Sequence, residues 1–260
     1  MKERLAIIGV PRREYEAIRE AHVGPIIYNE MLPKIVVNKG QLYVERTSGT
    51  GLLKVDKVVY YGIFEDDFDL ITGLAIWGGP CFPNAQAMLD TRLKLPCLAR
   101  ALQYSKFATP RGFISKQTSI NPTTELVAKW GNWHCGENKE RVNGLWTSEH
   151  PSVLEPFFKG QAVRIAIMGD QYWQIKLEGK SWLKSIHDER AHFMELDPEL
   201  LEDTQKIQEG FGLDFLANDY IVGDDGQKHL LEVNHIPNVT RFEAIRLAYI
   251  NTVKDWLTAK

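Results

Sequence analysis

The chain of 260 residues has few cysteines, no excess charge of one sign and no long apolar run. Its three cysteines, Cys81, Cys97 and Cys135, are widely spaced and form no CxxC pair, which argues against a disulfide framework or a zinc site and predicts reduced thiols. The formal net charge is −3 and no Lys/Arg cluster stands out, so electrostatics gives no argument for binding nucleic acid or a membrane surface.

Other absences narrow the class of protein further. No stretch approaches the roughly 20 apolar residues of a membrane-spanning helix, and the apolar run near residues 4–10 is too short for a signal peptide. No GxGxxG follows that run, so the sequence lacks a dinucleotide-binding fingerprint. With 44% hydrophobic and 25% charged residues, we expect a cytoplasmic globular protein of two or three subdomains.

The most informative stretch is a predicted β-hairpin within residues 215–233. Two short apolar runs flank an Asp-Asp-Gly turn, and each run contains one carboxylate, Asp219 or Glu232. Asn234 lies two residues after Glu232, so both side chains leave the strand on the same face. Three converging oxygen ligands suit a hard cation such as Mg²⁺. A solvated edge is the alternative, but the apolar neighbours predict burial, which requires a cation or several donors.

A resemblance to a known family rests on this hairpin. The segments GLDFLANDYIV, DDG and LEVNHIP resemble the C-terminal metal-binding segment of the ATP-grasp superfamily. The EVN-x-x-P form is most similar to the RimK and glutathione synthetase branch of carboxylate–amine ligases. The resemblance implies that Asp219, Glu232 and Asn234 hold Mg²⁺, or alternatively Mn²⁺, beside ATP. It also implies an α+β fold in which two α+β subdomains clamp ATP, preceded by a small α/β domain.

The rest of the chain resembles the family in the same order. Residues 1–88 read as a βα unit with further strands and a second helix, and correspond to the domain that precedes the grasp. Residues 89–155 correspond to the N-terminal lid subdomain of the grasp. Residues 156–260 correspond to its C-terminal metal-binding subdomain.

Two lysines and a glycine resemble the phosphate-binding elements of the family. Lys94 lies two residues before Pro96, which places it at the start of a helix, and its alternative role is a surface lysine. Lys129 ends an expected strand and precedes a glycine-bearing loop, where an ammonium and free backbone N–H groups can hold phosphates. Gly136 falls on a family glycine. The loop is poorer in glycine than the family pattern, and alone it reads as a plain turn.

Residues 152–168 resemble the hinge that binds adenine, with a strand, a break and a second strand. An apolar slot with a few fixed hydrogen-bonding groups is what a purine requires. The resemblance assigns the edge and the face of the base to Glu155, Phe157, Phe158 and Leu231. Ala162 stands where the family commonly has an acidic residue for the ribose, so Gln161 is the candidate to hold the ribose instead.

Three basic residues complete the expected site. Arg164 matches the family arginine on the strand after the hinge, where it would pair with a phosphate or form an inter-strand salt bridge. Lys184 lies where the RimK branch has residues that meet phosphate and metal. Arg241 follows the LEVNHIP segment in a loop that faces the substrate cleft of these ligases, where a guanidinium can hold a carboxylate or phosphate. Its alternative is a surface pair with Glu243.

The resemblance implies a ligase that transfers the γ-phosphoryl group of ATP to a carboxylate and lets an amine attack the acyl phosphate, with release of ADP and phosphate. Its partners would be a small-molecule or peptide carboxylate and an amine such as an amino acid. A kinase related to inositol phosphate kinases is an alternative, favoured by Asn238 after Pro237. A non-catalytic nucleotide-binding module, favoured by the altered loop, is another. The oligomeric state stays open, a homo-oligomer included.

Overall fold

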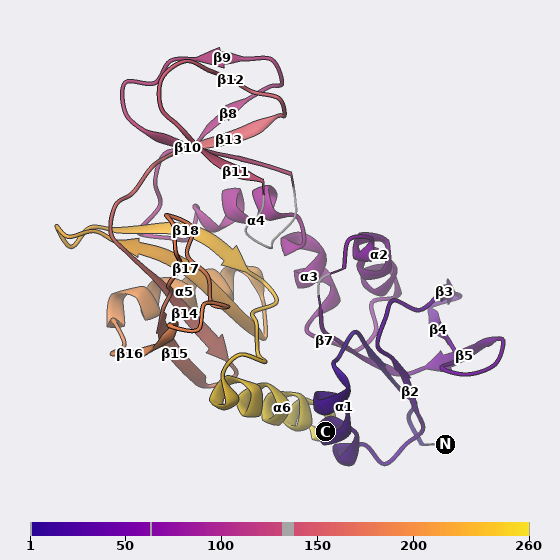
Figure 1. The fold of residues 1–260 in the computed structure, drawn as a ribbon. Helices are drawn as coiled ribbons and strands as arrows, with labels where there is room; N and C mark the ends of the chain where they lie inside the picture. Colours follow the sequence, from indigo (N-terminus) through magenta and orange to yellow (C-terminus); the bar gives the residue numbers. More distant parts are fainter. Residues whose placement is uncertain (1, 63, 132–137, 260) are drawn as a thin grey trace.

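The structure, a computed structural model, describes residues 2–62, 64–131 and 138–259 (Figure 1). It contains an N-terminal α/β part, a small β-rich lid and a C-terminal part built on a five-stranded sheet. The mixed α+β fold expected from the sequence is confirmed. None of the helices in the described part of the chain has the length and apolar character needed to cross a membrane.

The N-terminal part is organised around a parallel sheet with strand order β2-β1-β6-β7. All four residues of the central strand β1 are buried, as in strands that are covered on both faces of a parallel sheet. The elements of this sheet and its helices are β1 (Leu5–Ile8), α1 (Arg12–Ile18), η1 (Arg19–Ala21), β2 (Ile26–Asn29), β6 (Lys57–Tyr60), α2 (Asp67–Trp77) and β7 (Cys81–Phe82). A separate antiparallel sheet is formed by β3 (Ile35–Asn38), β4 (Gln41–Glu45) and β5 (Leu52–Val55).

Two short helices, α3 (Ala85–Thr91) and α4 (Lys94–Ala101), lead into the lid. The lid is an antiparallel sheet of order β11-β10-β13-β8 with a small ribbon of two further strands beside it (Figure 1). Its strands are β8 (Gly112–Ile114), β9 (Ser119–Ile120), β10 (Leu126–Trp130), β11 (Lys139–Val142), β12 (Trp146–Thr147) and β13 (Ser152–Pro156).

The two faces of the lid sheet differ in character because side chains alternate along a strand. Ala128, Val142 and Leu154 form a small apolar core on one face. Lys129 lies one position from Ala128 and therefore faces the other way, toward the C-terminal sheet. The lid thus presents a charged face to the five-stranded sheet below it.

The C-terminal sheet has strand order β16-β15-β14-β17-β18 and is antiparallel throughout. Its strands are β14 (Gln161–Met168), β15 (Gln171–Lys176), β16 (His192–Met194), β17 (Phe215–Val222) and β18 (Lys228–Asn234). The predicted hairpin is therefore present as β17 and β18. Leu216 and Tyr220 pack in the core beneath α5, whereas Phe215 and Ala217 belong to the core on the opposite face. Asp219 shares the parity of Ala217 and so faces away from α5.

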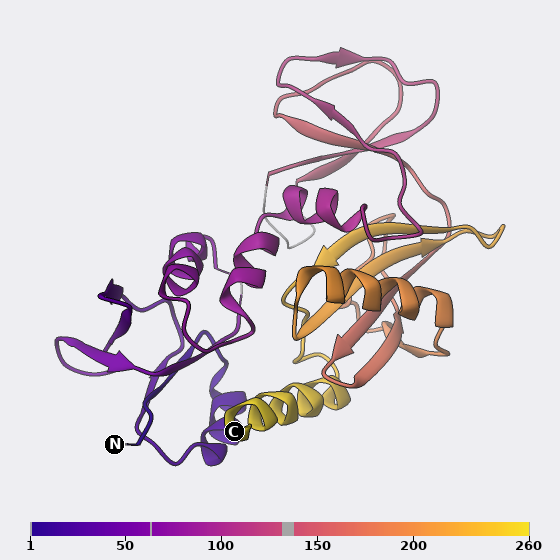
Figure 2. The same cartoon turned by 180° about the vertical axis from the view of Figure 1, so that it is seen from behind.

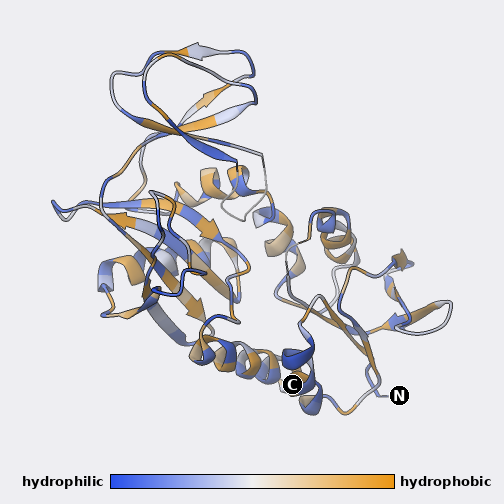
Figure 3. Cartoon of the chain, viewed as in Figure 1, coloured by the Kyte–Doolittle hydropathy of each residue, from blue (hydrophilic) through white to orange (hydrophobic). Residues whose placement is uncertain are grey.

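Two helices cover this sheet, α5 (Pro198–Phe211) and α6 (Glu243–Thr258). The Asp197 side chain accepts hydrogen bonds from the backbone of the first turn of α5, and Gly212 ends that helix with a left-handed φ of 65°. Helix α6 buries apolar residues along one side, which Figure 3 shows as alternating colours. It returns to the N-terminal part and packs on α1 (Figures 1 and 2).

The division into residues 1–88, 89–155 and 156–260 stays a prediction. Helix α3 runs across the first boundary and strand β13 across the second. The continuous packing of α6 on α1 also joins the C-terminal part to the N-terminal part.

Candidate nucleotide and metal site

The hairpin brings the three expected metal ligands together. Asp219 on β17 lies directly opposite Glu232 on β18, and a β-bulge follows between Asp219 and Tyr220. Bulges of this kind redirect side chains and are frequent beside functional sites. The Nδ2 atom of Asn234 lies 3.5 Å from Oδ2 of Asp219. The side chains of Asp219, Glu232 and Asn234 therefore lie together at one end of the hairpin.

This trio fits a divalent cation with hard-oxygen preference. Two of its three members are carboxylates, and among the described residues no group of three or more His, Cys, Asp or Glu side chains could hold a metal ion. Mg²⁺ commonly takes only one or two carboxylates and completes its shell with water and substrate phosphate. The residues present thus fit an ion that arrives with a nucleotide.

Each carboxylate of the hairpin already faces a cation from a different element. Arg164 on β14 binds Asp219 through two hydrogen bonds, with Nε 2.6 Å from Oδ1 and Nη2 2.8 Å from Oδ2. The inter-strand salt bridge that was the alternative role of Arg164 is therefore present. Burial lowers the pKa of Arg164, but the charge and hydrogen bonds of Asp219 raise it by more. The geometry is the bidentate form that gives the strongest pairs.

Lys94 lies at the first position of α4, as expected from Pro96, and its Nζ is 3.5 Å from Oε2 of Glu232. Lys94 is buried, with 5% of its surface exposed. A cation at the N-terminus of a helix is opposed by the helix dipole, so the carboxylate of Glu232 supplies the compensation. The surface role that the sequence left open for Lys94 is wrong.

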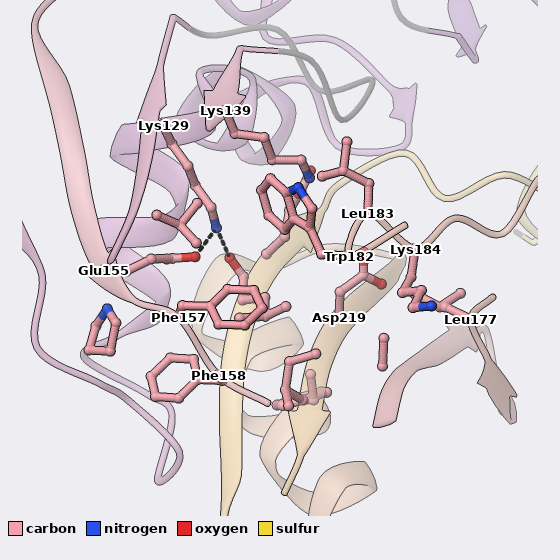
Figure 4. A pocket seen from close by; sticks show the side chains of 17 residues that line it. Lys129, Lys139, Glu155, Phe157, Phe158, Leu177, Trp182, Leu183, Lys184 and Asp219 are labelled. Atoms are coloured by element: carbon pink, nitrogen blue, oxygen red, sulfur yellow. Dashed lines mark hydrogen bonds and ion pairs between the residues drawn. The ribbon is translucent and has the colours of Figure 1, made fainter. Parts of the chain in front are cut away.

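The lid places a second buried pair over the hairpin. Lys129 on β10 lies with its Nζ 2.6 Å from Oε1 of Glu155, and it donates to the carbonyl of Leu231 at 3.2 Å (Figure 4). Arg111 holds the other oxygen of Glu155, with Nε 2.9 Å from Oε2. Burial lowers the pKa of Arg111, and Glu155 acts against that effect. The hinge glutamate is thus held between two cations.

A cavity lies between the charged face of the lid, the large sheet and the loop after β15 (Figure 4). Eight of the residues expected to form the site line it, namely Lys129, Glu155, Phe157, Phe158, Lys184, Asp219, Leu231 and Glu232. Lys94, Arg164 and Asn234 do not line it but contact its carboxylates. The structure therefore joins most of the expected site around one space.

Of the other expected residues, Gln161 and Arg241 do not line this cavity. The Gln161 amide nitrogen lies 3.7 Å from the sulfur of Met194, while its neighbour Ala162 lines the cavity. Arg241 donates to the carbonyl of Glu189 at 3.2 Å. Gly136 lies outside the described residues. Contacts of Gln161 with ribose, of Arg241 with substrate and of Gly136 with phosphate stay predictions.

The aromatic end of the cavity includes residues that the sequence did not indicate. Trp182 meets Phe157 edge to face with ring centroids 6.0 Å apart. Phe158 stacks on His229 at 3.8 Å, and burial lowers the pKa of that histidine. Lys184 donates to the carbonyl of Gly179 at 3.1 Å, within the same loop as Trp182. Phe157, Phe158 and Trp182 line the cavity, and apolar ring surface of this kind suits a purine base.

Arg111, Lys139 and Trp182 are functional candidates that sequence reasoning missed. Arg111 directly precedes β8, which pairs with β13 in the lid, and Lys139 lies on β11, so their positions in the site follow only from strand pairing. Trp182 lies in an irregular loop with no periodic pattern. A signal was present only for Lys139, because the lysine follows the glycine-bearing loop after Lys129 and returns on the next strand.

No family model matches the chain, and no curated protein matches it in sequence. Solved structures are similar over almost the full length. The ATP-grasp ligase PsnB complexed with a precursor variant, Mg and ADP has a TM-score of 0.62 at 12% identity, with 98% of both chains covered. D-alanyl-alanine synthetase A from Vibrio cholerae has a TM-score of 0.62 at 13% identity, with 97% of this chain and 98% of that chain covered.

A third similar structure is the RiPP-associated ATP-grasp ligase of Chryseobacterium gregarium in complex with ADP and a leader and core peptide. Its TM-score is 0.59 at 13% identity, with 99% of this chain and 96% of that chain covered. Matches at such low identity rest on the arrangement of the elements and not on sequence, and they extend from the N-terminal sheet to the last helix. This chain therefore has the ATP-grasp fold.

Proposed function

We propose that the protein is an ATP-dependent carboxylate–amine ligase that works through an acyl phosphate. One observation carries the proposal: Asp219, Glu232 and Asn234 converge beside the same cavity that Lys129 enters from the lid. The similar structures are ligases, and one is complexed with Mg and ADP, which supports nucleotide and Mg²⁺ as ligands. Mn²⁺ is the alternative ion.

The nucleotide would lie with its base at the aromatic end of the cavity and its phosphates toward the hairpin. Phe157, Phe158 and Leu231 line the first region, and Glu155 lies beside it. The phosphates would meet Lys129 and Lys94. In the structure these lysines are paired with Glu155 and Glu232, at 2.6 and 3.5 Å. A polyphosphate would take over these cations and leave Glu232 to the metal.

The bound metal, when present, neutralises charge on the transferring phosphoryl group. The chain itself orients the reacting groups. The carboxylate oxygen of the substrate attacks the γ-phosphorus, the bond to the bridging oxygen breaks, and its electron pair leaves with ADP. The amine then attacks the acyl carbon, phosphate departs with the electron pair of its C–O bond, and the amine loses a proton. No protein nucleophile is needed, because positioning and charge supply the catalysis.

The acceptor would enter from the side of the N-terminal part. Tyr61 of that part donates to the carbonyl of Pro237 at 2.8 Å and accepts from the Val239 backbone at 3.2 Å. This buried contact fixes the loop that carries Arg241. The similar ligases PsnB and the Chryseobacterium enzyme are complexed with peptides, and D-alanyl-alanine synthetase is named for a dipeptide product. A peptide or small-molecule carboxylate with an amine partner is therefore the proposed substrate class.

The kinase alternative finds no support in the local structure. Asn238, which favoured it, accepts hydrogen bonds from the backbone N–H groups of Thr240 at 3.1 Å and of Arg241 at 2.9 Å. Such a turn is a common reason for asparagine in a loop. Because this turn accounts for Asn238, the residue no longer distinguishes a kinase from a ligase.

Product analysis tests the proposal. The protein is incubated with Mg-ATP and pooled amino acids, peptides and cell extract, and the products are examined by mass spectrometry. A ligase gives ATP-dependent masses equal to two reactants less one water, or one peptide less water if it cyclises. The Glu232→Gln variant is the control and should give none. Phosphate added to a polyol, with no condensation product, would contradict the ligase.

A further inference from the structure

Lys139 is the one lysine on the charged face of the lid that the resemblance does not assign. It lies on β11 directly opposite Lys129 on β10, and opposed residues of an antiparallel pair leave on the same face. Lys139 lines the cavity together with Lys129, Asp219 and Glu232 (Figure 4). Two lysines of adjacent strands therefore extend into one space above the hairpin carboxylates.

The acidic groups around this space are engaged by other cations. Glu155 is paired with Lys129 at 2.6 Å, and Asp219 with Arg164 at 2.6 Å. Lys94 lies 3.5 Å from Glu232. Within residues 2–62, 64–131 and 138–259, by contrast, the ammonium of Lys139 has no ion pair and no hydrogen bond. The carboxylates of Glu232 and Asp219 act on it through their charge.

The surroundings make this ammonium costly to keep charged. Burial is the largest effect and lowers the pKa of Lys139, and the charges of Lys129 and Lys94 lower it further. Glu232 and Asp219 oppose these effects without cancelling them. A half-buried ammonium beside two others is favourable only if an anion completes the site. The cavity that it lines is formed by strands of the lid, strands of the C-terminal sheet and the loop after β15.

The position of Lys139 indicates which part of an anion it would meet. The aromatic residues Phe157 and Phe158 lie at the other end of the cavity, whereas Lys139 extends toward the side where Asp219 lies (Figure 4). A nucleotide with its base against the aromatic rings would extend its terminal phosphates toward Lys139. We propose that Lys139 is a third phosphate-binding lysine that recognises the terminal phosphate and makes the site selective for a nucleoside triphosphate.

This inference rests on the proposed function, since it assumes that the cavity takes a nucleotide. It adds that the site recognises a triphosphate and that Lys139 is the residue that recognises it. A structural role for Lys139 would give the opposite behaviour on mutation. Loss of a structural lysine destabilises the fold, whereas loss of an ammonium without an anion relieves repulsion from Lys129 and Lys94.

The test compares ATP, ADP and AMP binding, each with Mg²⁺, by calorimetry on wild type, Lys139→Gln and Lys139→Arg. Lys116→Gln removes an exposed lysine of the lid and is the matched control. We expect Lys139→Gln to lower the affinity for ATP about tenfold or more, which is the size of one charge-assisted hydrogen bond. The affinity for AMP should not change. Lys139→Arg should retain ATP affinity. The thermal midpoint of free Lys139→Gln should equal or exceed that of wild type.

Three outcomes separate the possibilities. The assignment of Lys139 is overturned if wild type binds ATP and Lys139→Gln binds ATP equally well. It is also overturned if the substitution lowers the affinities for ATP, ADP and AMP alike. In both cases the proposed function stands. If free Lys139→Gln melts lower than wild type and Lys116→Gln does not, the lysine is structural and the assignment is also overturned. If wild type binds none of the three nucleotides, both the assignment and the proposed function fail.

Discussion

Replacing Asp219 by Asn should destabilise the free protein, in addition to removing a metal ligand. The substitution preserves the shape of the side chain but leaves the Arg164 guanidinium without its carboxylate. Arg164 is 9% exposed and makes two hydrogen bonds to Asp219, at 2.6 and 2.8 Å. Breaking a buried pair from one side costs about 3–5 kcal/mol, and the partial exposure of Asp219 places this pair near the lower end.

A loss of about 3 kcal/mol corresponds to a fall of roughly 6–12 °C in the midpoint of a protein of this size. The assay is thermal and urea unfolding of wild type, Asp219→Asn, Arg164→Met and the double variant. Because the double variant removes both charges, it should recover part of the loss, which gives a coupling energy for the pair. Glu125→Gln breaks an exposed pair with Arg141 and should change the midpoint little. An unchanged midpoint in Asp219→Asn would refute this account of the pair.

Three further predictions concern substrate, pH and thiols. Arg241→Lys should raise the KM for the carboxylate acceptor several-fold with ATP affinity unchanged, because lysine loses the fork; an equal acceptor KM would place Arg241 outside the cleft. Since burial lowers the Lys139 pKa below the ordinary 10.5, wild-type ATP affinity should fall with rising pH earlier than that of Lys139→Arg; parallel profiles would contradict this. Burial raises the pKa of Cys81 and Cys97 to about 12, so native Cys135→Ser protein should show no thiol reactive toward Ellman's reagent and two after unfolding; a reactive native thiol would contradict this burial.

The hairpin could be predicted because its information is local. The apolar runs on both sides of the Asp-Asp-Gly turn fix the pairing, and that pairing alone sets Asp219 opposite Glu232. Helix α5 is similar, because Asp197 before Pro198 and Gly212 after Phe211 mark both ends. The overall fold followed from a resemblance carried by these local segments in their order along the chain.

The partners of the charged residues could not be predicted, because they depend on strand order and register. Arg111 reaches Glu155 only because β8 pairs with β13 in the lid. The contact of Arg164 with Asp219 requires β14 to pair with β17 across 55 residues of sequence. The two-residue strands β9 and β12 are also too short to show an alternating pattern.

The central claim is that the cavity between lid and hairpin binds a nucleotide together with a metal ion. It is tested most directly by the thermal midpoint of the protein with ATP alone, Mg²⁺ alone and both together. A ligand bound only to the folded state stabilises it by RT ln(1 + [L]/Kd), roughly 2.7 kcal/mol at a hundredfold excess over Kd. We predict a clear rise with ATP and Mg²⁺ together, absent in the Glu232→Gln variant. No rise in wild-type protein that is otherwise folded would contradict the claim.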